Sequence, residues 1–287
     1  MKTGRRKGHT LMSYRGFVSR CQGASHVESG TVCQDAAEFY ARQKLGICVV
    51  SDGHGSERHF RSNIGSEIAV NIAIRAVKQF VQKIQYGKGI TDANHAKILR
   101  DLAGYIVSRW VECVKTHYYE NPCTENENVI YGKHYKEDNP NLTKIYGATL
   151  IIGVLLENCA FILQNGDGAA FVVEQRGDAH VPSSTINEEL FAGTTTSLSS
   201  SNCLEDFRYY YTDRSPTAII VASDGIVDSY SGNNGNDFLV FCRKTLELYN
   251  EDANQAQIFI DDWLPQLSQQ GSRDDMSIAG VYLRETC

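Results

Sequence analysis

The sequence predicts an α+β fold in a single domain that spans all 287 residues. Strand patterns occur in runs and helical patterns occur in pairs, so strand and helix do not alternate regularly along the chain. Apolar residues make up 42% of the chain, which is enough for a substantial core. We find no internal repeat and no linker rich in Pro, Gly or Ser, and we therefore expect one core, from about residue 14 to residue 284.

Alternating or β-branched residues predict three strands near the start of the chain: Tyr14–Arg20, Ala36–Ala41 and Leu45–Ser51. Between the first two, residues 21–31 are rich in Gly and Ser and predict a loop. The second and third strands are separated by a short polar turn, which predicts an antiparallel hairpin. Because the start of one hairpin strand lies beside the end of the other, we expect Asp35 and Asp52 to be neighbours.

A four-residue spacing of apolar side chains, as in Ile64, Ile68 and Ile72, is typical of a helix that packs on a core. This spacing predicts four helices, at residues 64–87, 92–118, 237–249 and 253–267. Pro265 is expected to bend the last of them. The four helices fall into two pairs, one before and one after the middle of the chain.

Five further strands are predicted: Ala148–Leu156, Cys159–Leu163, Ala169–Glu174, Thr217–Ser223 and Met276–Arg284. Short turns join the first three of these, which predicts a meander of neighbouring strands. Residues 121–144 and 182–215 are polar and show no sustained period. We interpret these two segments as long surface excursions or lids of functional length.

Composition and charge exclude several classes of protein. The formal net charge is −6 and Lys and Arg are scattered, so nucleic acid is not an expected partner. No window approaches the roughly twenty apolar residues of a membrane span, and the basic N-terminus lacks the apolar core of a signal peptide. The nine cysteines are odd in number and without CxxC spacing, which favours reduced thiols, no zinc site and a cytoplasmic protein.

Two apolar runs end in the same way, since Val49–Ser51 is followed by Asp52-Gly53 and Ile219–Ser223 is followed by Asp224-Gly225. Alone, an Asp-Gly pair after a strand is typical of a turn. Further carboxylates also stand at strand ends: Asp167, Asp228, Asp274 and Asp275. Converging carboxylates repel one another unless cations neutralise them, so we expect two divalent ions at this edge of the core.

The candidate ligands are oxygens without a thiolate or imidazole cluster, which favours Mn²⁺ or Mg²⁺. Such ions lower the pKa of a bound water and stabilise an in-line attack on phosphorus. His54 follows Gly53 directly and is placed to donate a proton to the leaving oxygen. The alternative is that His54 is an ordinary histidine of a surface turn.

Five motifs occur in a fixed order: Asp52-Gly53-His54-Gly55, Tyr146–Leu150, Asn165–Gly168, Ser223–Asp228 and Ser272–Ser277. In this order and in these strand contexts they resemble the metal-dependent protein phosphatases of the 2C type, in a divergent bacterial branch. The resemblance covers most of the chain, from about Gly23 to Leu283. It implies a four-layer αββα sandwich, in which pairs of helices flank two antiparallel sheets.

The resemblance also implies a signalling enzyme that hydrolyses phosphoserine or phosphothreonine on a protein and opposes a Ser/Thr kinase. By position, Asp52 resembles the carboxylate that bridges two metal ions, and His54 the proposed general acid. The other positions that resemble metal-site residues are the Gly53 carbonyl, Asp224 and Asp274 for two ions, Asp167 and Asp228 for a possible third ion, and Asp35 in the outer shell.

Four departures concern both sides of the site. Gln34 stands where many members have Glu, and Gly30 stands where many have a phosphate-binding Arg. Gly168 and Ala169 replace a usual Ser-Arg pair, and Asp275 replaces a common Asn. We call residues Asp52–Gly55 the metal loop. The residues that we predict to bind phosphate in place of the usual Arg follow this loop: Arg58, His59 and Arg61. The alternative for these three residues is a solvated helix start.

Three functions remain open at this stage. A pseudophosphatase that only binds a partner would be expected to lose metal ligands, yet Asp52, Asp224 and Asp274 are all present. An active protein phosphatase is therefore favoured over a binding module. The absence of the usual Arg keeps a metal-dependent phosphoesterase of small molecules as a further alternative.

Overall fold

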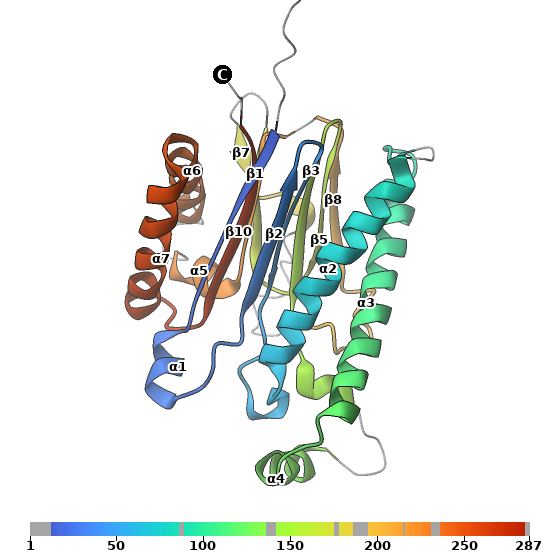
Figure 1. Ribbon diagram of the computed structural model, residues 1–287, viewed down its shortest axis with the longest axis vertical. Helices are drawn as coiled ribbons and strands as arrows, with labels where there is room; N and C mark the ends of the chain where they lie inside the picture. Colours follow the sequence, from blue (N-terminus) through green and yellow to red (C-terminus); the bar gives the residue numbers. More distant parts are fainter. Residues whose placement is uncertain are drawn as a thin grey trace, which may run out of the picture.

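The computed structural model describes residues 13–85, 89–135, 142–174, 178–185, 195–214, 216–230 and 236–284. Two five-stranded antiparallel sheets face each other, and a pair of helices covers the outer face of each sheet (Figure 1). The chain is thus the α+β sandwich of four layers that was predicted. None of the described helices is long and apolar enough to cross a membrane.

The first sheet has the strand order β1 (Ser13–Cys21), β10 (Met276–Arg284), β9 (Ala218–Ala222), β6 (Ala169–Val173) and β7 (Ala179–His180). The first and last strands pair here, with Ser13 at the start of β1 opposite Arg284 at the end of β10. The helices α6 (Asn236–Glu251) and α7 (Ala253–Gln270) cover this sheet. Phe17 of β1 stacks on Tyr249 of α6, with ring centroids 4.1 Å apart.

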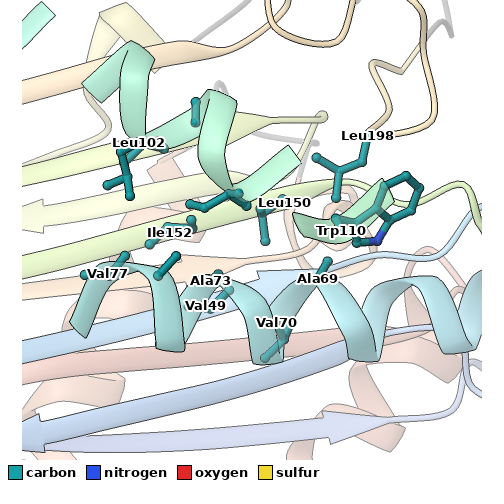
Figure 2. Packing of buried hydrophobic residues seen from close by; sticks show 14 of the residues in the cluster. Val49, Ala69, Val70, Ala73, Val77, Leu102, Trp110, Leu150, Ile152 and Leu198 are labelled. Atoms are coloured by element: carbon teal, nitrogen blue, oxygen red, sulfur yellow. The ribbon is translucent and has the colours of Figure 1, made fainter. Parts of the chain in front are cut away.

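The second sheet has the strand order β2 (Ala36–Arg42), β3 (Leu45–Ser51), β4 (Leu150–Leu156), β5 (Ala160–Asn165) and β8 (Arg208–Thr212). The helices α2 (Ser62–Gln85) and α3 (His95–Glu120) lie across it. Figure 2 shows part of the apolar layer between these helices and the sheet: Val49, Ala73, Val77, Leu102 and Ile152. Within this layer, the Trp110 indole donates a hydrogen bond to the Gly65 carbonyl (2.9 Å), which ties α3 to the first turn of α2.

A separate apolar layer fills the space between the two sheets. Val50, Ile151 and Val221 belong to it, and all three are buried. Strands β3, β4 and β9 lie in the middle of their sheets, with one face against the other sheet and one against helices. Burial on both faces is why these segments read as continuous apolar runs rather than as alternating patterns.

The predicted meander is wrong in its third strand. Strand β4 pairs with β5 as expected, but β6 crosses to the other sheet and pairs with β9, with Ala169 opposite Ala222. The crossing occurs at the turn of residues 166–168. Gly166 has a φ of +121° there, a backbone conformation that residues other than glycine rarely adopt. Because the turn spans both sheets, Asp167 lies between the strand ends of the two halves.

Five short α-helices and β-strands were not predicted, and β7 is one of them. Helix α1 (Ala24–Ser29) replaces an expected loop, and α5 (Asp224–Ser229) begins at the second Asp-Gly pair. The polar segment 121–144 contains α4 (Glu125–His134), and the segment 182–215 contains β8. Helix α4 had a recognisable signal, since Thr124 and Glu127 form a capping box. The last two residues of the helix predicted at 64–87 lie outside the described residues.

Candidate metal centre

Carboxylates from both sheets meet at one end of the sandwich. Asp52 follows β3, Asp224 follows β9 by two residues, and Asp167 lies in the turn between β5 and β6. Each of these three carboxylates has an oxygen within 4.8 Å of an oxygen of the other two. The strand ends therefore bring together carboxylates that are up to 172 residues apart in the sequence.

The loop that carries Asp52 is held by the short motif of residues 147–149. The Asp52 amide donates to Thr149 Oγ1 (3.0 Å), and the Thr149 amide donates to the Asp52 carbonyl (2.8 Å). The His54 amide donates to the Gly147 carbonyl (3.1 Å). The Tyr146–Leu150 motif thus positions the backbone of the metal loop and adds no side chain to the carboxylate cluster.

Close backbone approaches explain why glycine occupies two of these positions. A Cβ on Gly53 would lie 2.6 Å from the Gln34 carbonyl oxygen. A Cβ on Gly147 would lie 2.6 Å from His59 Nδ1 and 2.7 Å from His54 Cδ2. Any side chain at either position would displace the loop or the two histidine rings.

The side of the site that carries Asp224 is held by the start of β10. The Ser277 amide donates to Ser223 Oγ (2.9 Å), and the Ser272 hydroxyl donates to the Gly225 carbonyl (2.8 Å). A Cβ on Gly225 would lie 2.0 Å from the Asp275 carbonyl oxygen, so Asp224 needs a glycine as its neighbour. This contact explains the second Asp-Gly pair by packing.

The acidic region consists of the carboxylates of Asp52, Asp167 and Asp224 and of three further residues: Asp274, Asp228 and Asp35. Asp274 lines the cleft beside Asp52 and Asp224. Asp228 is exposed on α5, and its pKa is raised by partial burial and by the charges of Asp167 and Asp274. Asp35 precedes β2, in which Ala36 pairs with Ser51, so Asp35 lies beside Asp52 as the hairpin predicted.

Two buried oxygens of this region have no hydrogen-bond donor among the described residues: Asp167 Oδ1 and Gln34 Oε1. A buried acceptor without a donor is costly, because it has lost its bonds to water. Oxygen acceptors that need positive partners fit a hard divalent cation, and this donor set suits Mn²⁺ or Mg²⁺.

The pKa values of these carboxylates are raised in the absence of a cation. Burial raises the pKa of Asp35 to about 7, and Asp275 adds to the effect. Burial and the charge of Asp167 raise the pKa of Asp224 to about 7. Burial, followed by the charge of Asp35, raises the pKa of Asp52. Desolvation and repulsion between carboxylates raise these pKa values because no positive charge offsets them, which again fits a cation site.

The carboxylates open into a cleft of about 420 Å³. It is lined by Asp52, Gly53, His54, Gly55, Ser56, His59, Thr195, Ser197, Asp224 and Asp274. Sequence reasoning missed Thr195 and Ser197, which come from the polar segment 182–215. Their run of Thr and Ser carries no periodic signal, so only the fold reveals that these two residues line the cleft.

Two histidines form one wall of the cleft. The rings of His54 and His59 meet edge to face, with centroids 4.9 Å apart. His59 Nδ1 also contacts the Lys144 carbonyl. Burial lowers the pKa of His54 to about 4, and the positive charge of His59 contributes, so His54 is neutral at pH 7 in the metal-free protein.

The three predicted phosphate partners have different surroundings. His59 lines the cleft, whereas Arg58 is exposed, and its carbonyl accepts a hydrogen bond from the Tyr135 hydroxyl (2.7 Å). Arg61 is buried, and the prediction for it fails on the geometry. Its guanidinium forms two hydrogen bonds with Glu127 (2.8 and 3.0 Å) and donates to the Asn121 carbonyl (2.8 Å).

Arg61 therefore braces α4 and the two residues Asn121 and Pro122 before it against the loop that carries Asp52. Glu57, two residues after Gly55, adds contacts from Lys133 Nζ (2.6 Å) and His134 Nε2 (3.0 Å) of α4. The bidentate guanidinium lowers the pKa of Glu127 to about 2. The described first part of the predicted excursion, up to His134, is consequently fixed beside the cleft by these contacts.

Comparison with known proteins agrees with this arrangement. A family model described as protein phosphatase 2C matches residues 22–265, which is most of the chain. The chain therefore belongs to the protein phosphatase 2C family. No curated protein sequence gave a significant match.

Solved structures share the fold at low sequence identity. The serine/threonine phosphatase PstP/Ppp of Mycobacterium tuberculosis is 12% identical with a TM-score of 0.54, and 95% of this chain and 99% of that chain are covered. PppA of Pseudomonas aeruginosa, a regulatory component of T6SS, is 17% identical with a TM-score of 0.56 over 95% and 99%. The catalytic domain of PstP has also been crystallised with two manganese ions, at 12% identity and a TM-score of 0.54.

Proposed function

We propose that this chain is a metal-dependent protein phosphatase that hydrolyses phosphoserine or phosphothreonine. The observation that carries the proposal is the convergence of Asp52, Asp167 and Asp224, whose oxygens lie within 4.8 Å of one another beside unpartnered buried acceptors. Membership of the protein phosphatase 2C family and the two manganese ions of the PstP structure support the same reaction class.

In this proposal, Asp52, the Gly53 carbonyl, Asp224 and Asp274 hold two Mn²⁺ or Mg²⁺ ions. Asp167 and Asp228 offer oxygens for a third ion, and Asp35 orients water from behind Asp52. When bound, the ions supply an activated water and offset the negative charge of the phosphoryl group. We assign these roles by the positions of the residues in the family motifs, and the grouping of Asp52, Asp167 and Asp224 supports a cation site at this place.

The protein side chains then complete the hydrolysis. The water oxygen bonds to phosphorus, the bond from phosphorus to the ester oxygen breaks, and that oxygen takes up a proton. His54 stands on the cleft wall and is our candidate for donating this proton. Its pKa of about 4 applies to the empty cleft, and a phosphate dianion beside the ring favours the protonated form.

The substrate partner that we propose is a phosphorylated protein, and a Ser/Thr kinase would supply it. Ser56 lines the cleft and is exposed, and its hydroxyl can bond to phosphate or to a peptide backbone. The cleft volume of about 420 Å³ accommodates a phosphorylated side chain.

The decisive experiment compares three substrates with the purified protein and excess Mn²⁺: p-nitrophenyl phosphate, a set of phosphoserine and phosphothreonine peptides, and small alkyl phosphates. We expect turnover of the aryl phosphate and of the peptides, and loss of both on chelation. No turnover of any substrate at any metal concentration would leave a binding module. Turnover of small alkyl phosphates without peptides would indicate a small-molecule phosphoesterase.

A further inference from the structure

A groove between α6 and α7 has no role in the reaction proposed above. Its volume is about 540 Å³, which is in the range of sites that bind small molecules. None of the described residues that line this groove also lines the cleft of the carboxylates, so the two hollows are separate. Six of its lining residues are apolar or aromatic: Tyr230, Val240, Phe241, Leu248, Phe259 and Trp263.

The groove exists because the apolar arc of α6 is wider than the face that the helix buries. Phe238, Cys242 and Leu246 are buried in the apolar cluster between the helices and the first sheet. Val240 of α6 and Phe259 of α7 are apolar as well, yet each is 50% exposed. In Figure 1 the two helices form the outer layer on their side of the sandwich. Exposed apolar side chains that gather in one hollow, with charged residues around them, are typical of a binding surface.

Stacked aromatic rings form part of the groove wall. The ring of Tyr230 stacks on Phe241, with centroids 5.2 Å apart, and Phe259 stacks on Trp263, with centroids 6.3 Å apart. The Trp263 indole donates a hydrogen bond to the Tyr230 hydroxyl (3.3 Å), which joins the two pairs. These contacts hold the rings in place without a ligand. A preformed aromatic wall suits a ligand with an apolar, aromatic body.

The charged side chains of the groove indicate the charge of its ligand. Asp237, Glu247 and Glu251 supply three carboxylates, and Lys244 is the one basic side chain among the described lining residues. Glu247 and Glu251 are exposed, and neither forms an ion pair with another described residue. They lie four residues apart on α6, so both carboxylates can approach the same cation. The groove therefore favours a cationic ligand over an anionic one.

Helix α5 connects the groove with the acidic region. Asp224 begins this six-residue helix, and Tyr230, which follows its last residue, lines the groove. The Tyr230 amide donates to the Val227 carbonyl (3.0 Å), and the Ser229 hydroxyl donates to the Gly225 carbonyl (2.8 Å). A ligand that holds the Tyr230 ring therefore restrains a helix whose first residue belongs to the carboxylate cluster.

We propose that the groove between α6 and α7 binds a small molecule with an apolar, aromatic body and a cationic group, and that this molecule strengthens metal binding through α5. The aromatic body contacts the wall that contains Trp263, and the cation lies beside Glu247 and Glu251. Binding in the groove does not depend on the proposed phosphatase function. The effect on metal binding rests on the cation site of that proposal.

The probes are two dansyl compounds with the same fluorophore. Dansylcadaverine ends in an ammonium group, and N-hexyl dansylamide has a methyl group in its place. Fluorescence titration of the full chain should give a Kd for dansylcadaverine of roughly 10 to 100 μM, as expected for a ligand of this size. A Kd above about 1 mM in the wild type would overturn the proposal.

Three variants test the site. For Glu247→Gln/Glu251→Gln we expect the dansylcadaverine Kd to rise roughly 3- to 10-fold, with the N-hexyl dansylamide Kd changed less than about 2-fold, because only the ion pairs are lost. Val240→Arg places a long cationic side chain at the groove and should raise both Kd values about 10-fold. The control Asp101→Asn/Glu112→Gln removes two exposed carboxylates from α3 and should change neither Kd.

The effect on the metal centre is measured by calorimetric titration with Mn²⁺. Saturating dansylcadaverine should lower the Mn²⁺ Kd about 5-fold, and by linkage saturating Mn²⁺ should lower the dansylcadaverine Kd by the same factor. Val240→Arg lies outside the carboxylate cluster and should keep the Mn²⁺ Kd of the free wild type while losing most of the response to the probe. An Mn²⁺ Kd that is the same with and without the probe would overturn the coupling through α5.

The remaining outcomes concern the occupant of the groove. An unchanged dansylcadaverine Kd in Val240→Arg would place the probe elsewhere and overturn the site. Equal losses of both probes in Glu247→Gln/Glu251→Gln would overturn the cationic class of ligand. A dimer that sedimentation detects without probe, and that Val240→Arg dissociates, would assign the groove to a second copy and overturn the proposal. Probe binding in a protein without phosphatase turnover would support the groove and reject only the enzyme.

Discussion

The two sides of the cleft are built by different means. The acidic side comes from strand ends in both sheets, where Asp52 and Asp224 each follow a buried run and precede a glycine. The histidine side comes from the short helical turn Glu57–His59, through His59. The first side could be located from the sequence. For the second side the sequence suggested Arg58, His59 and Arg61, of which His59 lines the cleft and Arg61 is bound to Glu127 instead.

The difference shows what positions a side chain. A residue just beyond a buried strand is placed by the register of the sheet, which the apolar pattern already determines. A long cationic side chain on a loop is placed by whichever carboxylate it meets. Arg61 meets Glu127 of α4, and no local pattern relates residues that are 66 positions apart.

The largest expected effect concerns the acidic side. Asp224→Asn removes one charge from the cluster, and we expect turnover of p-nitrophenyl phosphate to fall about 10³-fold or more, because several kcal/mol of charge stabilisation depend on the ions. The fold should remain, as judged by circular dichroism. The matched control Asp101→Asn lies on the exposed face of α3 and should keep full activity. An Asp224→Asn protein with wild-type turnover would refute the two-metal proposal.

A smaller effect is expected on the histidine wall. His54→Ala should slow hydrolysis of alkyl phosphates, including phosphoserine peptides, by about 10²-fold, since these leaving groups need a proton. Aryl phosphates have better leaving groups and should be affected less. The ratio of kcat values for the two substrate types is the measurement. An equal loss for both would argue against His54 as the general acid.

The bracing of the cleft rim can be tested through stability. Arg61→Met leaves the half-buried Glu127 carboxylate without its partner, and we expect a loss of about 3 kcal/mol in the free energy of unfolding. Urea denaturation measures this loss. The exposed pair Lys97–Asp101 is the comparison, because Lys97→Met should cost less than about 0.5 kcal/mol. Similar values for the two variants would show that α4 is not held by Arg61.

The smallest effect is a dependence of metal-free stability on pH. Asp35 and Asp224 have pKa values of about 7 in the folded protein, so between pH 4 and pH 7 the folded state binds protons that the unfolded state has lost. Their stabilising contribution is complete below about pH 4 and is lost as the pH rises through 7. His54 acts in the opposite direction, because its folded pKa of about 4 lies below the unfolded value of 6.5.

The carboxylates with raised pKa values, which include Asp52, have a larger combined effect on stability than His54. The Tm in EDTA should therefore fall on the order of 5 °C between pH 5 and pH 8. Saturating Mn²⁺ at pH 8 should reverse the fall, since the ions replace the protons. Scanning calorimetry at several pH values tests both statements. A Tm in EDTA that rises steadily to pH 8 would show that the carboxylates are not coupled as described.

By itself, the sequence determined all the strands except β7 and β8, the four long helices and the strand ends at which the carboxylates stand. The hairpin placed Asp35 beside Asp52, and the repeated Asp-Gly pairs indicated Asp52 and Asp224 as partners, because strand periodicity and turn chemistry are local properties. The five ordered motifs indicated the protein phosphatase 2C family, which the family match confirms.

Only the tertiary structure decided the surroundings of these groups. It placed β6 in the other sheet, attached Arg61 to α4, and brought Thr195 and Ser197 to the cleft. Each of these placements depends on contacts between segments far apart in the sequence. Their energies come from packing and charge pairing that no local window of residues contains.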